Sequence, residues 1–193
     1  MSKIFYLMGK SASGKDTIYK KVKEQMPGLK TIVIYTTRPV REGEQNGREY
    51  HFVDDDKLKE LQDAGKVIEL REYNTVHGIW KYFTADDGQF DGDDNYLAIG
   101  TLESYVKMRD YFGQNRLVPI YVEVEDGLRL ERALMRERMQ ATPKYEEMCR
   151  RFLADAADFS EDNLNKAGIT EKFINMDMDK CVGEIVLGIC KKI

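Results

Sequence analysis

The sequence lacks the long apolar runs and the excess of basic charge that mark several broad protein classes. No apolar run approaches the roughly 20 residues of a membrane span, and the first run, residues 4–8, is too short for the core of a signal peptide. Lysine and arginine total 30 against 34 acidic residues, a net charge of −4. A general nucleic-acid binder needs a basic surface. We therefore expect neither a nucleic-acid partner nor a membrane partner.

Patterns for redox chemistry and zinc binding are also scarce. The cysteines Cys149, Cys181 and Cys190 form no CxxC pair, which is typical of reduced thiols in a cytoplasmic protein. The histidines His51 and His77 have no neighbouring cysteine and no HExxH pattern. A zinc site is therefore not expected.

What the sequence does contain is the alternation of an α/β domain. Its 193 residues, 42% of them hydrophobic and 33% charged, suit one globular domain. Apolar runs of strand length fall at 4–8, 31–35, 67–70, 96–99, 117–124 and 173–174. Helical patterns fall between 15 and 26, after 54, and at 102–111, 128–137, 145–159 and 182–189. This order predicts a doubly wound parallel sheet with helices on both faces.

The strongest chemical signal is residues 9–15, GKSASGK, between the first strand and a helix start. Glycines let backbone N–H groups wrap an anion, and the helix N-terminus adds partial positive charge. Lys15 can reach the β and γ phosphates of a nucleotide. A surface Gly/Ser turn is the weaker interpretation. The residues expected to bind ATP are Gly9, Ser11, Ala12, Ser13, Gly14, Lys15, Asp16 and Thr17.

The loop departs from the GxxxxGK pattern at the position after the lysine. The pattern has a hydroxyl there to ligate Mg²⁺, whereas this chain has Asp16, followed by Thr17. An acid beside a triphosphate is repelled unless a metal bridges the two. Asp16 is therefore either a ligand of Mg²⁺ or of its water, or an acid of the first helical turn that points away.

A second cluster of phosphate-binding groups lies in residues 36–52, TTRPVREGEQNGREYHF. Arg38 and Arg41 are three residues apart in a loop, and paired guanidinium groups chelate phosphate with bidentate geometry. Tyr50 adds a neutral hydroxyl donor. From the chemistry alone, a solvated cationic loop is slightly favoured.

A phosphate loop followed by TTRPxRxGExxGxxYxF resembles the guanylate kinases, which are P-loop nucleoside monophosphate kinases. The resemblance extends over nearly the whole chain and implies transfer of the ATP γ-phosphoryl group to GMP with Mg²⁺. It also implies a core that comprises residues 1–35 and 95–193, and the sequence leaves a monomer or a homodimer open. Residues 36–94 would then form an inserted monophosphate-binding subdomain, and residues 130–150 a helical lid.

The resemblance implies a set of residues for binding GMP. Three of them, Arg38, Arg41 and Tyr50, would hold its phosphate, and Arg38 would also be catalytic. The strand VIE matches the family's Phe-Ile-Glu, so Glu69 would accept hydrogen bonds from guanine. Residues 78–84, GIWKYFT, resemble a degraded GxxYG segment with one extra residue. Through this segment Tyr82 would contact the phosphate, and Thr84 the base.

The resemblance also assigns roles near ATP. Arg136 and Arg151 would close over the triphosphate as catalytic lid arginines together with Lys15, and Arg138 is held in reserve. Solvated helix faces balanced by glutamates are the alternative for these arginines. Asn175 would lie near the adenine, and its alternative is a turn or helix-cap residue.

Three positions depart from the family, and they leave base specificity open. Ile34 replaces a serine, and Ala98 and Gly100 replace two aspartates that hold GMP and organise metal in the family. A kinase for another nucleoside monophosphate is therefore one alternative. A catalytically inactive guanylate-kinase-like binding module is the other, although the Gly14–Lys15 pair and the lid arginines argue against it.

Overall fold

The computed structural model describes residues 2–41, 43–75 and 78–193. The core sheet has five parallel strands in the order β2-β7-β1-β8-β9. Its strands are β1 Ile4–Met8, β2 Lys30–Thr31, β7 Tyr96–Gly100, β8 Leu117–Glu123 and β9 Lys172–Ile174. The helices around it are α1 Lys15–Gln25, α3 Leu102–Phe112, α6 Glu161–Lys166 and α7 Met178–Cys190. None of the helices in the described ranges has the length and apolar character of a bilayer span.

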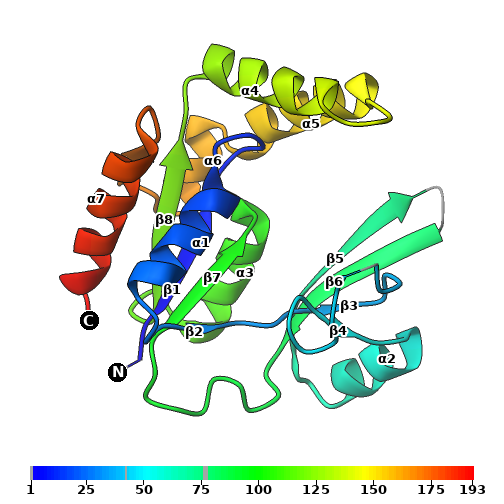
Figure 1. The fold of residues 1–193 in the computed structure, drawn as a ribbon. Coiled ribbons are helices and arrows are strands. Elements are labelled where there is room, and N and C mark those ends of the chain that lie inside the picture. The colour runs from blue at the N-terminus through cyan, green and yellow to red at the C-terminus, as the bar shows by residue number, and fades with distance from the viewer. Residues whose placement is uncertain (1, 42, 76–77) are drawn as a thin grey trace.

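Strand β1 runs through the middle of the core, and all five of its residues are buried. Successive side chains of a strand point to opposite faces. Ile4, Tyr6 and Met8 accordingly pack with α3 and α6, whereas Phe5 and Leu7 pack with α1 and α7. Figure 1 shows α1 and α7 together on one face of the sheet. The prediction of a doubly wound parallel sheet with helices on both faces is confirmed.

A second sheet lies beside the core, in the order β4-β3-β6-β5 (Figure 1). Its strands are β3 Tyr35–Thr36, β4 His51–Phe52, β5 Val67–Thr75 and β6 Gly78–Ala85, and helix α2 spans Asp55–Asp63. The Asp54 carboxylate caps α2 by accepting from Lys57 N. Leu58 and Leu61 of α2 pack with Phe83 of β6 in a small core of their own.

The run predicted as one strand at 31–35 is divided between the two sheets. Thr31 pairs with β7 in the core, whereas Tyr35 pairs with β4 and β6. Both ends of the run have β propensity, and propensity does not say which sheet a residue joins. The short strand predicted at 67–70 is also wrong in length, because β5 continues to Thr75 as one arm of a long hairpin with β6. Strands β4 and β6 and helix α6 were not predicted.

Helices α4 Asp126–Arg138 and α5 Tyr145–Asp158 lie against each other beyond the carboxyl end of the core sheet (Figure 1). They follow β8 directly in the chain. The cysteines are free thiols: Cys149 and Cys190 are exposed, and Cys181 is buried between α7 and the sheet. Burial raises the pKa of the Cys181 thiol to about 11.

Candidate active site

The loop between β1 and α1 has the backbone of an anion cradle. Gly14 has a φ of 84° and Ala12 a φ of 63°, both in the left-handed region. A Cβ on Gly14 would also lie 2.6 Å from the Asn175 Nδ2 atom, and one on Gly9 would lie 2.6 Å from the Val122 oxygen. Position 14 therefore requires glycine both for its left-handed conformation and for lack of space, and position 9 requires it for lack of space alone.

The start of α1 directs its free N–H groups into this loop. The first hydrogen bond at the start of α1 runs from Ile18 N to Gly14 O, so the preceding N–H groups have no partner inside the helix. The Lys15 ammonium lies 3.6 Å from an Asp16 carboxylate oxygen. Asp16 is 81% exposed at its side chain, and Thr17 is also exposed. Donors and one cation thus face the space where a phosphate would sit.

Asn175 supports the loop from behind. Its side chain is fully buried, and its Nδ2 donates to the Ser13 carbonyl at 2.8 Å. Its backbone N–H donates to Glu123 O at the end of β8. This side chain is closed beneath the loop, and the expectation that Asn175 lies near the adenine stays a prediction. The geometry assigns Asn175 a role in holding the loop.

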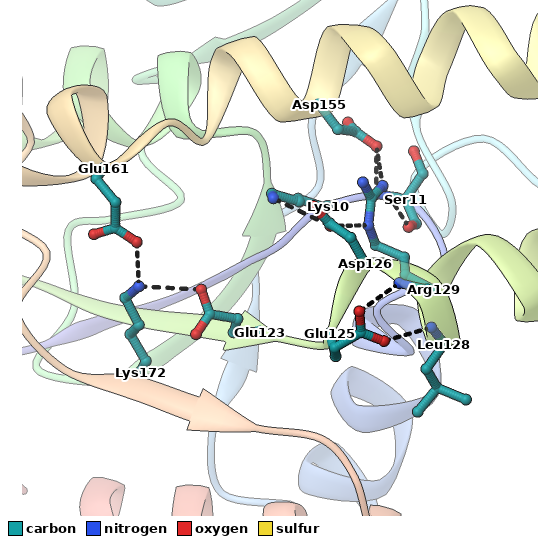
Figure 2. A network of polar contacts seen from close by, with 11 residues as sticks. Lys10, Ser11, Glu123, Glu125, Asp126, Leu128, Arg129, Asp155, Glu161 and Lys172 are labelled. Carbon is teal, nitrogen blue, oxygen red and sulfur yellow. Dashed lines mark hydrogen bonds and ion pairs between the residues drawn. The ribbon is translucent and has the colours of Figure 1, made fainter.

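A polar network joins the phosphate loop to α4 and α5, as Figure 2 shows. An Asp155 carboxylate oxygen accepts from the Ser11 N–H at 2.7 Å and from Arg129 Nη1 at 3.3 Å. Arg129 is 1% exposed, and its Nε donates to Asp126, which also pairs with Lys10. The Arg129 guanidinium lies 3.9 Å from the centre of the Phe152 ring. This network fixes where the two helices sit over the loop.

The predicted lid arginines Arg136 and Arg151 line one cavity between α4 and α5, of about 250 Å³. Ser11 of the phosphate loop lines the same cavity. Arg151 Nε donates to Glu147 at 2.7 Å, and Arg136 is exposed. Arg138 does not line this cavity. The structure therefore brings both preferred arginines to the phosphate loop and leaves the reserve one aside.

In the loop after β3, the Arg38 side chain is 3% exposed and its guanidinium is held by Glu44. The two side chains form a bidentate pair at 2.8 and 3.0 Å, and Glu44 also accepts from Arg41 N at 2.8 Å. The hydrogen bond to Arg38, followed by that from Arg41 N, lowers the pKa of Glu44. This carboxylate therefore links the Arg38 guanidinium to the backbone of Arg41 within the loop.

Aromatic rings surround these arginines. The Arg38 guanidinium lies 5.3 Å from the Tyr50 ring centre, and the Tyr50 and Tyr82 centres are 5.7 Å apart. Tyr73 lies 5.6 Å from Tyr82, and Arg41 lies 5.9 Å from the Trp80 ring. The structure therefore gathers the side chains expected to bind the monophosphate. Glu42, which belongs to the motif at residues 36–52, and His77 lie outside the described residues.

Glu69 and Thr84 meet on neighbouring strands of the same sheet. Thr84 Oγ1 donates to Glu69 Oε1 at 2.8 Å, and both residues are buried. Arg71 forms a bidentate pair with Glu69 through Nε at 2.9 Å and Nη2 at 3.2 Å. Burial is the largest single effect and acts against the charged form of Arg71, but the charge of Glu69, the nearby Tyr6 and Tyr73 and the hydrogen bond to Glu69 together raise the pKa of Arg71.

One cavity of about 500 Å³ connects the second sheet with the phosphate loop. Its lining includes Gly9, Ser11 and Lys15 of the loop, Tyr73 of β5, and Gly100 at the end of β7. In open α/β sheets, ligands bind outside the carboxyl ends of the parallel strands. The cavity has this position and is large enough for the phosphate groups of two nucleotides to meet.

The residues around the loop fit a magnesium ion only together with a nucleotide. In the part of the chain that the structure describes, no group of three or more His, Cys, Asp or Glu side chains is arranged to hold a metal. Mg²⁺ is commonly bound by one or two carboxylates and substrate phosphates. The exposed carboxylate of Asp16, next to Lys15, has this chemistry.

Sequence reasoning missed four residues that shape the site: Glu44, Arg71, Arg129 and Asp155. Arg71 follows Glu69 by two positions, so strand alternation could have placed both on one face. Glu44 lies inside the recognised loop motif. The contacts of Arg129 and Asp155 with Ser11 span 118 and 144 residues, and no local pattern signals them.

Comparison with known proteins finds similarity to guanylate kinases. A family model described as guanylate kinase matches residues 1–79. A guanylate kinase of Mycobacterium bovis is 29% identical over 94% of this chain, and one of Koribacter versatilis is 34% identical over 65% of it. One of Rhodopseudomonas palustris is 47% identical over 34% of the chain. The chain resembles guanylate kinases.

The extent of the guanylate kinase likeness differs between relatives. The aligned segments span 30% of the Rhodopseudomonas protein, 55% of the Koribacter protein and 79% of the Mycobacterium protein. The crystal structure of a guanylate kinase from Anaplasma phagocytophilum superposes with a TM-score of 0.66 over 99% of this chain and 86% of that one. Its sequence identity is 22%, so this match supports the fold alone.

Proposed function

We propose that this chain is an ATP:GMP phosphotransferase. The observation that carries the proposal is the shared cavity, which the phosphate loop and the second sheet line together. Phosphoryl transfer requires alignment and charge neutralisation more than covalent work by the protein. Lys15 of the phosphate loop lines this cavity, and the second sheet reaches it through Tyr73, whose ring adjoins Tyr82 of the proposed acceptor site.

On the donor side, Lys15 and the N–H groups of residues 12–17 hold the ATP phosphates. Asp16 would hold Mg²⁺ together with these phosphates, and the ion, when bound, neutralises charge on them. Arg136 and Arg151 lie on α4 and α5 beside Ser11. As residues 130–150 close as a lid, these arginines neutralise the transferring group and exclude water.

On the acceptor side, the subdomain of residues 36–94 holds the monophosphate. Arg38 and Arg41 bind its phosphate, and the hydroxyl groups of Tyr50 and Tyr82 donate hydrogen bonds to that phosphate. Thr84 faces the base. Glu44 holds Arg38 before substrate arrives, so the guanidinium is oriented at little entropic cost. The acceptor oxygen is thereby directed towards the γ-phosphorus of ATP.

The test is a coupled assay of ADP release with GMP, dGMP, AMP, CMP, UMP and dTMP as acceptors. We expect GMP to be phosphorylated, and Lys15→Ala to lower kcat by at least about 100-fold because it removes the cation at the β and γ phosphates. The matched control is Lys20→Ala, an exposed lysine on the same helix, which should leave kcat unchanged. Full turnover by Lys15→Ala would contradict the proposal, and ATP binding without any turnover would indicate a binding module.

A further inference from the structure

Two cavities meet at Ser11 of the phosphate loop. The smaller one, of about 250 Å³, is lined by Ser11 together with Arg129 of α4 and Arg151 of α5. The larger one, of about 500 Å³, is lined by Ser11 together with Lys15 and Asp155. We call them the arginine cavity and the lysine cavity. Ser11 is thus part of the wall between two groups of cations that the proposed reaction needs around one triphosphate.

Asp155 and Arg129 complete this wall by binding both polar groups of the Ser11 backbone. An Asp155 carboxylate oxygen accepts from the Ser11 N–H at 2.7 Å, and Arg129 Nη1 donates to the Ser11 carbonyl at 3.4 Å. The same guanidinium nitrogen donates to the same Asp155 oxygen at 3.3 Å (Figure 2). Because Arg129 lines the arginine cavity and Asp155 lines the lysine cavity, their ion pair lies between the two.

The Asp155 carboxylate stands where an anion of the nucleotide is expected. In a phosphate loop the backbone N–H groups cradle phosphates, and the lysine reaches the β and γ phosphates. Asp155 accepts from one of the loop N–H groups, and its side chain, 17% exposed, lines the same cavity as Lys15. Glu103 and Asp158 also line this cavity. A triphosphate that enters it therefore meets several acids, and Asp155 is the one that already holds a loop donor.

Arg129 has a donor to offer in addition to those it uses. Its side chain is 1% exposed, and its Nη2 atom has no hydrogen-bond partner among the described residues. A buried donor without a partner is costly and calls for an explanation. A phosphate group in the arginine cavity would supply the partner, because phosphate accepts from two guanidinium nitrogens at once.

We propose that Asp155 holds the place of the terminal phosphate of the donor nucleotide in the free protein, and that this phosphate displaces it. The inference rests on the proposed function and adds to it a residue that competes with the donor. Once displaced, Asp155 releases the Ser11 N–H and the Arg129 guanidinium. Both groups then bind the phosphate beside Lys15. The contact stabilises the free chain and must break for the nucleotide to bind, so its loss weakens folding and strengthens ATP binding.

The test is isothermal titration calorimetry of ATP and of ADP, each with Mg²⁺, on the unaltered chain and on Asp155→Asn. The amide keeps the shape of the side chain and removes its charge, so we expect Kd for ATP to fall about 5- to 10-fold. ADP lacks the third phosphate, and its Kd should change by less than about twofold. Urea unfolding should show the free variant to be less stable than the unaltered chain. Unchanged or weaker ATP binding by Asp155→Asn would overturn the inference, because the contact would then only support the loop.

Asp158→Asn is the matched control. Asp158 lies on the same helix and lines the same cavity, whereas the described hydrogen bonds of the Ser11 backbone go to Asp155 and Arg129. Because the Asp158 side chain is exposed, water screens its charge, and Kd for ATP should change by less than about twofold. A gain equal to that of Asp155→Asn would overturn the inference, since any acid of the cavity would then have the same effect. Absence of ATP binding by all three proteins would defeat the proposed function itself, whereas ATP binding that Asp155→Asn does not tighten would defeat this inference alone.

Discussion

At the scale of single residues, the side chains that we propose bind phosphate differ from those that hold the phosphate loop in place. Lys15 lines the cavity, whereas Asn175 and Asp155 hold the loop backbone: Asn175 donates to the Ser13 carbonyl from the buried side, and Asp155, which also lines the cavity, accepts from the Ser11 N–H. The Asp16 side chain is exposed, so it is available to a ligand and does not support the loop. A single exposed carboxylate next to a lysine binds a cation weakly alone, and a bound triphosphate would complete the ligand set.

Asp16→Ala should therefore raise the Mg²⁺ concentration needed for half-maximal activity, by about 10-fold, the order of effect seen when a metal-site group is lost. The measurement is a Mg²⁺ titration of ADP release at saturating ATP. Asp179→Ala is a suitable control, since this exposed acid pairs with Lys21 on the outside of α1 and α7. An unchanged Mg²⁺ requirement in Asp16→Ala would show that the acid points away from the metal.

At the scale of elements, helix α5 carries charge pairs that keep its arginines extended along its surface. Glu147 accepts hydrogen bonds from Nε and Nη2 of Arg150 at 2.7 and 2.8 Å, and from Nε of Arg151 at 2.7 Å. Such pairs at spacings of three and four residues support the helix modestly. They also place Arg151 over the cavity before ATP arrives.

These bonds, first that of Arg150 and then that of Arg151, lower the pKa of Glu147 to about 2. Because the folded pKa lies below the ordinary value, the pairs stabilise α5 above the ordinary glutamate range and are lost only as pH falls towards about 2. NMR titration of the Glu147 carboxyl should show it still ionised at pH values where ordinary glutamates are protonated. Arg150→Ala should move the midpoint upwards, and a normal midpoint in the unaltered chain would contradict the pairing.

At the scale of the whole molecule, distant segments meet at one cavity, which the phosphate loop, helix α5 and the second sheet line together. Asp155 connects α5 to the loop after β1, and Tyr73 brings the second sheet to the same space. Neither contact is local in sequence. The position of α4 and α5 over the loop thus depends on a buried arginine and its two acids.

Asp155→Ala should lower the free energy of unfolding by about 2 kcal/mol, because it leaves the buried Arg129 and the Ser11 N–H each short of a partner. Urea unfolding followed by circular dichroism measures this difference. The control is Asp158→Asn on the same helix. Burial, followed by the charges of Asp155 and Glu103, raises the pKa of Asp158, so removing its charge should leave stability unchanged or slightly higher. Equal losses in the two variants would contradict the special role of Asp155.

The sequence was sufficient wherever one segment contains its own reason for folding. The apolar run at residues 4–8 predicted the central strand, and the glycines and lysine at 9–15 predicted a phosphate loop whose backbone has the left-handed conformation at Gly14. The loop at 36–52 supplied Arg38, Arg41 and Tyr50 by its motif. The structure gathers these three, and their roles remain proposals.

The tertiary structure decided what depends on partners far along the chain. It divided residues 31–35 between two sheets, paired Arg71 with Glu69, and placed Asp155 on the Ser11 N–H. Local propensity and periodicity describe how a segment folds and which face it buries. Which sheet it joins, and which charge meets a buried arginine, depends on long-range packing, and only the folded chain supplies that.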